Sequence, residues 1–134
     1  MYPNYIKKII NTFYKNNFKA YVVGGAVRDY LLDITPKDYD LCTDAKPNTI
    51  IDIFNSKYKL ITSFKKYGTI TIIDNNKFIE VTTFRTEKKY KNNRKPSEVT
   101  FTNNLKKDLI RRDFTINSIA YNHLEGIIDP FNGY

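Results

Sequence analysis

The chain has 134 residues, of which 41% are hydrophobic and 15% aromatic, and this composition excludes a disordered tail. One domain of this size buries about two thirds of the surface of its unfolded chain, so a core without disulfides is feasible. The 22 basic and 14 acidic side chains give a net charge of +8, which favours a polyanionic partner such as RNA or a nucleoside triphosphate but also fits a lysine-rich solvated surface.

Cys42 is the only cysteine and His123 the only histidine, which excludes an intramolecular disulfide and a zinc site built from cysteine and histidine. The sequence contains no apolar run as long as a signal peptide or as the roughly 20 residues of a membrane span. We therefore expect a cytoplasmic protein with no membrane partner.

The first third of the chain predicts a helix, a strand and a second helix. Isoleucine and phenylalanine recur at helical spacing at positions 6, 9, 10 and 13, after Pro3, which suits a first turn. The short apolar run at Ala20–Val23 predicts a strand that ends at a glycine pair, and residues 26–32 predict a helix.

The middle of the chain predicts four strands around one helix. Residues 38–43 alternate acidic and bulky side chains, so the period of two places Asp38 and Asp40 on one face of a strand. Pro47–Phe54 predicts a helix with proline at its start. Strands are expected at residues 60–64, 69–74 and 78–85, with a hairpin turn at residues 74–76.

The last third is less regular. Residues 86–98 are basic and almost free of apolar side chains, which predicts a mobile loop. Helices are expected at residues 104–112 and 115–121, and a short strand at residues 126–129. The sequence contains no internal repeat and no linker, so we expect one domain over residues 1–134.

Gly24 and Gly25 lie between the first predicted strand and the helix that follows it. A glycine pair lets backbone N–H groups approach an anion closely, and the start of a helix favours phosphate. Arg28, beside Asp29, could supply a charged fork to a phosphate oxygen. The pattern predicts a triphosphate-binding turn, and the alternative is a tight turn followed by an exposed ion pair.

Asp38, Asp40 and Glu80 are the candidate catalytic carboxylates. Two aspartates at i and i+2 of a strand have Cβ atoms roughly 6–7 Å apart, and Mg²⁺ prefers such oxygen ligands. Two metal ions about 3.5–4 Å apart can stabilise both the attacking and the leaving oxygen of an in-line displacement. Glu80 lies within a predicted strand, where a charge is costly unless it is paired, metal-bound or exposed. Solvated strand positions are the alternative for all three.

Arg111, Arg112, Asp113 and Asn117 surround a predicted break between two helices. The arginines could bind phosphates while Asp113 or Asn117 hydrogen-bonds a ribose hydroxyl. An arginine pair that offsets a helix dipole, followed by a helix cap, explains the same residues structurally.

These motifs follow one another in a defined order. The segments are GGAVRDYLL at 24–32, KDYD at 37–40, EVTTFR at 80–85, RKP at 94–96 and RRDFTIN at 111–117. Together they resemble the head domain of class II CCA-adding enzymes and bacterial poly(A) polymerases. The resemblance extends over nearly the whole chain, from about residue 20 to residue 134.

The resemblance implies an α+β fold of the polymerase-β nucleotidyltransferase type, in which helices flank a mixed β-sheet. By motif, Asp38 and Asp40 would bind two Mg²⁺ ions, and Gly24, Gly25 and Arg28 would hold the incoming triphosphate.

For the remaining motifs, the resemblance implies that Arg112, with Arg111, contacts the nucleotide while Asp113 and Asn117 read its ribose. Glu80 matches an acidic position of the family. The segment 86–98 resembles a loop beside the family's active site, with two asparagines at 92 and 93 where Asp-Gly is usual, and we assign it no catalytic residue.

The implied reaction is attack of an RNA 3′-hydroxyl on the α-phosphate of ATP or CTP, with release of pyrophosphate and no covalent enzyme intermediate. Residues 128–134 resemble a family segment that stops partway, so we expect either a head-domain fragment or a reduced protein that needs a separate neck and body chain. CCA addition to tRNA, poly(A) addition, and nucleotide or RNA binding without catalysis stay open as functions.

Overall fold

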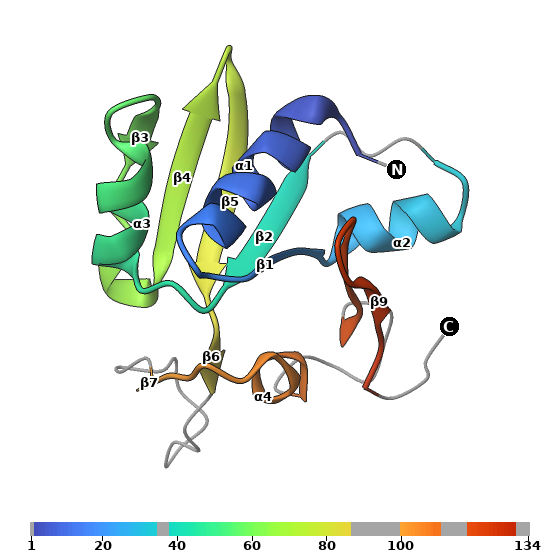
Figure 1. Ribbon diagram of the computed structural model, residues 1–134. Helices are drawn as coiled ribbons and strands as arrows, with labels where there is room; N and C mark the ends of the chain where they lie inside the picture. The colour runs from blue at the N-terminus through green and yellow to red at the C-terminus, as the bar shows by residue number, and fades with distance from the viewer. Residues whose placement is uncertain (1, 35–37, 87–99, 111–117, 131–134) are drawn as a thin grey trace.

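The computed structural model describes residues 2–34, 38–86, 100–110 and 118–130, which form a mixed β-sheet flanked by helices (Figure 1). The elements in chain order are α1 (Asn4–Lys15), β1 (Ala20–Val23), α2 (Gly25–Leu31), β2 (Tyr39–Thr43), α3 (Pro47–Phe54), β3 (Lys59–Ile61), the 3₁₀ turn η1 (Lys65–Tyr67), β4 (Thr69–Asp74), β5 (Lys77–Thr83), β6 (Arg85–Thr86), β7 (Thr100–Phe101), α4 (Leu105–Ile110), β8 (Ala120–Asn122) and β9 (Gly126–Ile128).

The main sheet has seven strands in the order β3-β4-β5-β2-β1-β8-β9. Strands β2 and β5 run parallel, and every other neighbouring pair in the sheet is antiparallel. β6 and β7 form a separate two-stranded ribbon. The α+β class with a mixed sheet, expected from the sequence, is thereby confirmed.

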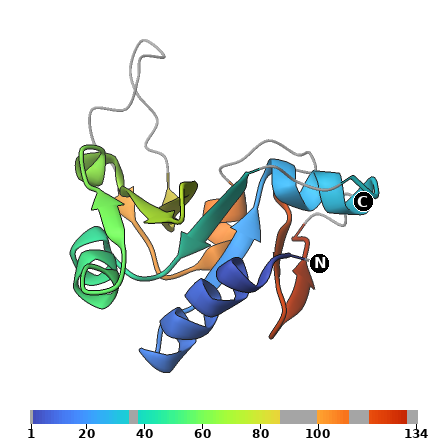
Figure 2. The ribbon, with the colours of Figure 1, turned by 90° about the horizontal axis from the view of Figure 1, so that it is seen from above.

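The main hydrophobic core lies between one face of the sheet and helices α1 and α3, which both lie on that side in the view from above (Figure 2). The stripe of α1 at positions 6, 9, 10 and 13 is fully buried. Phe13 meets Phe54 of α3 edge to face, with ring centroids 4.9 Å apart. The helical spacing of four apolar residues therefore determines which side of α1 packs on the sheet.

The opposite face of the sheet, which we call the second face, carries a smaller core under α4. Tyr21 and Val23 of β1 pack there with Cys42 of β2, Phe84 and Leu109. Buried Asp108 of α4 accepts a hydrogen bond from the backbone N–H of Arg85 at 2.9 Å, which joins α4 to β6. Both faces of β1 are therefore buried, and its unbroken run of four buried residues reflects this.

Most expected elements are confirmed, including α1, β1, α3, β4 and β9. The predicted hairpin turn joins β4 to β5, where Asn75 and Asn76 have positive φ angles of 48° and 68°, as a two-residue turn of the primed type requires. Two expected strands are shorter than predicted: β3 ends at Ile61, and the strand expected at 78–85 is divided into β5 and β6 at Phe84.

The helix expected at residues 115–121 is wrong where the structure describes it. Ala120–Asn122 form β8, which pairs with β1 through Val22 and Tyr121. The free edge of β1 supplies partners for the backbone of this segment, and this long-range pairing outweighs the local helical preference.

Within these described residues, no helix is both long enough and apolar enough to span a bilayer. Most of the expected loop at 86–98 lies outside the described residues, and Thr86 belongs to β6.

Candidate active site

The glycine turn follows β1 directly. Gly24 has φ 74° and ψ −139°, a region open to glycine but strained for residues with a Cβ atom. The turn allows α2 to begin at Gly25, with Gly24 alone between the helix and the last strand residue, Val23. Since Val23 pairs with Asp40 across the antiparallel β1–β2 ladder, the turn lies beside the start of β2.

The two aspartates lie at this same start of β2. Tyr39 is buried in the main core, whereas Asp38 and Asp40 on either side of it are exposed. Side chains alternate along a strand, so both carboxylates face away from the main core, on the second face. The predicted placement of Asp38 and Asp40 on one face is confirmed, and the β1–β2 ladder adds that they lie next to the glycine pair. Their catalytic roles stay a prediction.

Glu80 lies next to this pair on the neighbouring strand. It is the register partner of Asp40 in the parallel β2–β5 ladder and is exposed, so the two carboxylates share one face on strands about 4.8 Å apart. The described residues include no group of three or more histidine, cysteine, aspartate or glutamate side chains that could hold a metal ion.

Arg28 folds back over the glycine turn. A Cβ atom at Gly25 would lie 3.4 Å from Nη2 of Arg28, so the absence of a side chain there leaves room for the guanidinium. Nε and Nη2 of Arg28 donate to Oδ1 of Asp29 at 3.3 and 3.2 Å. The Arg28 side chain is 51% exposed, which leaves donors of the fork accessible to an anion.

The predicted nucleotide-binding residues Arg111, Arg112, Asp113 and Asn117 lie outside the described residues. The described residues resume at Ser118. Shortly after it, Ala120 of β8 pairs with Val23, next to the glycine turn.

A polar cluster that sequence analysis did not identify ties α1 and β1 to the β8–β9 hairpin. The hydroxyls of Tyr14 and Tyr21 donate to Oε2 of Glu125 at 2.5 and 2.6 Å. Nδ2 of Asn122 donates to the Tyr14 hydroxyl at 2.7 Å and to the Ala20 carbonyl at 2.9 Å. No local periodicity could have revealed this cluster, because its members are about 100 residues apart in sequence.

Burial and hydrogen bonding within this cluster shift the pKa values of Tyr14 and Glu125. Burial and the hydrogen bond to Glu125 raise the pKa of Tyr14 to about 12. Burial opposes ionisation of Glu125, but hydrogen bonds from Tyr14 and Tyr21 outweigh it, so the pKa of this carboxyl lies below its usual value.

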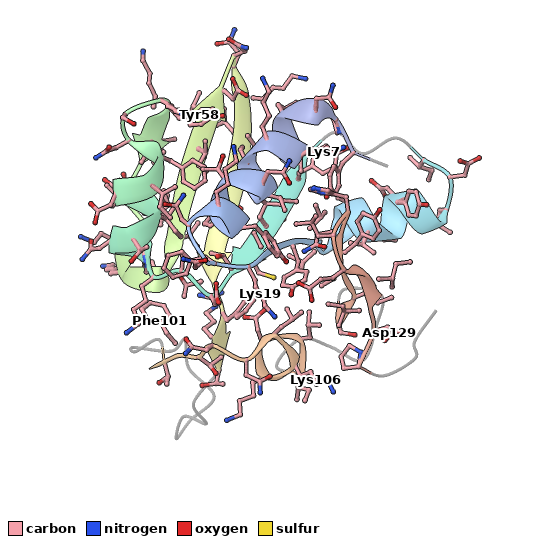
Figure 3. The ribbon with its side chains drawn as sticks, viewed as in Figure 1. Lys7, Lys19, Tyr58, Phe101, Lys106 and Asp129 are labelled. Carbon is pink, nitrogen blue, oxygen red and sulfur yellow. The ribbon has the colours of Figure 1, made fainter. Side chains whose placement is uncertain are left out.

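An open pocket of about 700 Å³ lies beside the cluster, lined by Tyr21, residues 102–106, Glu125 and Ile128. Figure 3 shows Lys106 and Asp129 on this side of the molecule, near α4 and β9. The residues that line this pocket include neither Asp38 nor Asp40.

Comparison with known proteins identifies one family over most of the chain. Residues 20–134 match the family model described as the poly A polymerase head domain. A CCA-adding enzyme from Listeria monocytogenes serotype 4a (strain HCC23) is 50% identical over 116 residues, which cover 87% of this chain and 29% of that protein.

Solved structures agree. The Bacillus stearothermophilus CCA-adding enzyme in complex with CTP is 40% identical, with a TM-score of 0.82 over 99% of this chain and 31% of that chain. A tRNA nucleotidyltransferase complexed with a primer tRNA and an incoming ATP analog is 28% identical, with a TM-score of 0.69 over 93% of this chain and 35% of that chain.

The chain thus spans about 30% of the length of its curated relatives. The sheet has the nucleotidyltransferase fold of the CCA-adding enzymes, as the motifs predicted. With a family model matched over residues 20–134, the chain belongs to the poly A polymerase head-domain family.

Proposed function

We propose that this chain is the catalytic head of an RNA nucleotidyltransferase that transfers CMP and AMP from CTP and ATP to the 3′ end of tRNA. The observation that carries the proposal is the pairing of Val23 with Asp40, which brings Asp38 and Asp40 next to the Gly24-Gly25 turn. A carboxylate pair beside a phosphate-binding turn is the arrangement that metal-assisted phosphoryl transfer needs.

The donor set at this site fits Mg²⁺. Asp38 and Asp40 are exposed carboxylates at the start of one strand, and Mg²⁺ is typically bound through one or two carboxylates together with water and substrate phosphates. These two residues would hold the ions, which supply charge neutralisation for the transferred phosphoryl group and its leaving pyrophosphate.

The protein's own residues bind and orient the reactants. The backbone at Gly24 and Gly25 lets phosphate oxygens approach closely, and Arg28 adds a cationic fork above the same turn. Catalysis of this kind depends on positioning and electrostatics rather than on a covalent enzyme intermediate.

The motif at residues 111–117 supplies the remaining residues of the proposed nucleotide site. Arg111 and Arg112 would neutralise phosphates, and Asp113 and Asn117 would hydrogen-bond the ribose. A reaction on tRNA agrees with the cytoplasmic location expected from the sequence.

CCA addition is favoured over its alternatives by the curated relatives, which carry the name CCA-adding enzyme. Poly(A) addition is the second candidate, because the matched family model carries the poly A polymerase description. Binding without catalysis is the third, and it predicts triphosphate binding without incorporation.

The first experiment compares Asp40→Asn with Asp52→Asn. Asp52 is an exposed aspartate on α3, on the other side of the sheet, so it is a matched control for the loss of one negative charge. We expect Asp40→Asn to lower nucleotide incorporation into RNA by at least about 100-fold, since a metal ligand supplies several kcal/mol. Equal activity of the two variants would refute the catalytic site.

The second experiment determines base choice. The protein is incubated with tRNA that lacks its terminal CCA, magnesium and each triphosphate separately, with and without the neck and body of a relative, and the product ends are sequenced. CCA addition predicts cytidines from CTP and a terminal adenosine from ATP, whereas poly(A) addition predicts an adenosine tract. If no nucleotide is incorporated under any condition, both catalytic functions are excluded and only nucleotide or RNA binding without catalysis remains.

A further inference from the structure

The second face of the sheet continues beyond the aspartates as an ordered surface across β5, β4 and β3. Leu60, Ile72, Ile79 and Tyr39 are register partners across these strands and β2, and all four contribute to the main core. The residues between them in sequence must therefore project from the second face.

Two rows of side chains result from this register. In one row, Ile61, Thr71, Glu80 and Asp40 are successive partners from β3 to β2. In the other row, Lys59 pairs with Ile73 and Ile73 with Phe78. Continuing the parallel ladder by one residue from the Tyr39–Ile79 pair brings Asp38 opposite Phe78.

The side chain of Phe78 is unusually exposed for a phenylalanine in a β-sheet. Its side chain is 57% exposed, although phenylalanine normally contributes a large buried apolar area. It projects from the strand adjacent to the carboxylate pair, with half-buried Ile73 beside it on β4. A flat apolar ring in this position can stack on a nucleic-acid base.

The far end of the same surface is formed by β3, which lies in a lysine-rich part of the chain. Residues 55–67, which include the edge strand β3, carry four lysines and no acidic residue. Exposed Lys59 lies at the end of the row that leads through Ile73 and Phe78 to Asp38. Three inter-strand spacings of about 4.8 Å separate Lys59 from Asp38, roughly 14 Å in all.

The geometry points to a path for the RNA substrate. We propose that the single-stranded 3′ end of RNA crosses the second face from the lysine-rich β3 edge toward Asp38 and Asp40, and that a base near its 3′ terminus stacks on Phe78. The basic edge complements the RNA backbone, and the stacked base holds the terminal hydroxyl near the carboxylates. This inference rests on the proposed function and adds a positioning residue to it.

The first test measures binding of a short single-stranded RNA, labelled with fluorescein at its 5′ end, by fluorescence anisotropy without triphosphate. Phe78→Ala should weaken binding about 5- to 100-fold, which corresponds to the loss of one base–aromatic stack. Phe78→Tyr, which keeps the ring, should retain the wild-type Kd. Circular dichroism should show both variants folded, because the side chain is largely exposed.

Leu124 provides a control for the loss of an exposed apolar side chain. It is 52% exposed and lies between β8 and β9, at the opposite edge of the sheet from β3. Leu124→Ala should leave the Kd unchanged. The proposal is overturned if Phe78→Ala binds like wild type, or if Leu124→Ala loses as much affinity as Phe78→Ala.

The second test addresses the basic edge through salt dependence. Lys59→Gln should reduce the slope of log Kd against log salt concentration by about 0.7, the value for one phosphate contact to a single strand. Lys8→Gln on α1, an exposed lysine on the other side of the sheet, should leave the slope unchanged. Equal slopes for the two variants would contradict the path.

A third test separates this inference from the proposed function. RNA ending in 4-thiouridine is cross-linked to the Asp40→Asn variant, which should bind RNA without transferring a nucleotide. The cross-linked tryptic peptide should be FIEVTTFR, which begins at Phe78. A cross-link to α1 or α3 overturns the path. If the wild type transfers no nucleotide but Phe78→Ala still weakens RNA binding, only the catalytic proposal is overturned.

Discussion

At the scale of single residues, the backbone conformation of Gly24 fixes the geometry of the candidate site. A positive φ of 74° turns the chain from β1 into α2 within one residue, while Val23 remains paired with Asp40. Gly126, the first residue of β9, has a similar φ of 78°. A Cβ atom at either glycine would meet nothing within 4 Å. Steric contact therefore cannot distinguish the two positions.

The comparison of Gly24→Ala with Gly126→Ala uses this similarity. Both substitutions should lower the free energy of unfolding by about 1–3 kcal/mol, because alanine is strained at positive φ. Only Gly24→Ala should also lower nucleotide transfer, since it alone alters the turn that we propose binds the phosphates. Chemical denaturation and an incorporation assay on both variants check this, and equal losses of transfer would assign Gly24 a purely structural role.

At the scale of elements, Glu125 joins three parts of the fold. Its carboxylate accepts hydrogen bonds from Tyr14 of α1 and Tyr21 of β1, and it lies in the turn between β8 and β9. Asn122 completes the connection through Tyr14 and Ala20. The short strands β8 and β9 thus gain side-chain anchors in addition to their ladder.

The lowered pKa of Glu125 predicts a specific pH dependence of stability. A carboxyl whose folded pKa lies below its unfolded value of 4.5 stabilises the fold at pH values above 4.5, and this stabilisation is lost as the pH falls through the folded pKa. Glu125→Gln should therefore be less stable than wild type at pH 7, and the difference should shrink below about pH 4.5.

Urea denaturation of both proteins between pH 3 and 7 measures this difference. The exposed Asp52→Asn variant, whose aspartate lies on α3, serves as the control for the removal of one charge. A gap between wild type and Glu125→Gln that stays constant over the whole range would contradict the assigned ionisation.

At the scale of the whole molecule, the sheet couples two cores. The main core lies under α1 and α3, and the smaller core lies under α4 on the second face. Strands β1 and β2 contribute residues to both, so neither core can open without disturbing the same ladder.

This coupling predicts one cooperative unfolding transition. Phe13→Leu in the main core and Phe84→Leu in the smaller core remove equivalent, almost fully buried rings, and each should cost about 1–2 kcal/mol. Thermal unfolding followed by near-UV and far-UV circular dichroism should give coincident transitions in both variants. A second transition that appears only in Phe84→Leu would show that the two cores unfold separately.

Local patterns determined a large part of this structure. The spacing of α1, the alternation around Tyr39 and the two asparagines of the β4–β5 turn are signals contained within a few residues, and each is present in the fold as predicted. The glycine pair and the two aspartates were recognised in the same way, because strand and turn chemistry act over short distances.

The sequence by itself thus determined the fold class, most elements and the placement of Asp38 and Asp40 on one shared face of a strand. Only the tertiary structure decided that β2 pairs parallel with β5, which brings Glu80 and Phe78 beside these aspartates, and that Ala120–Asn122 form a strand. The physical reason is that register between distant strands depends on backbone partners and packing that become available only when the sheet assembles.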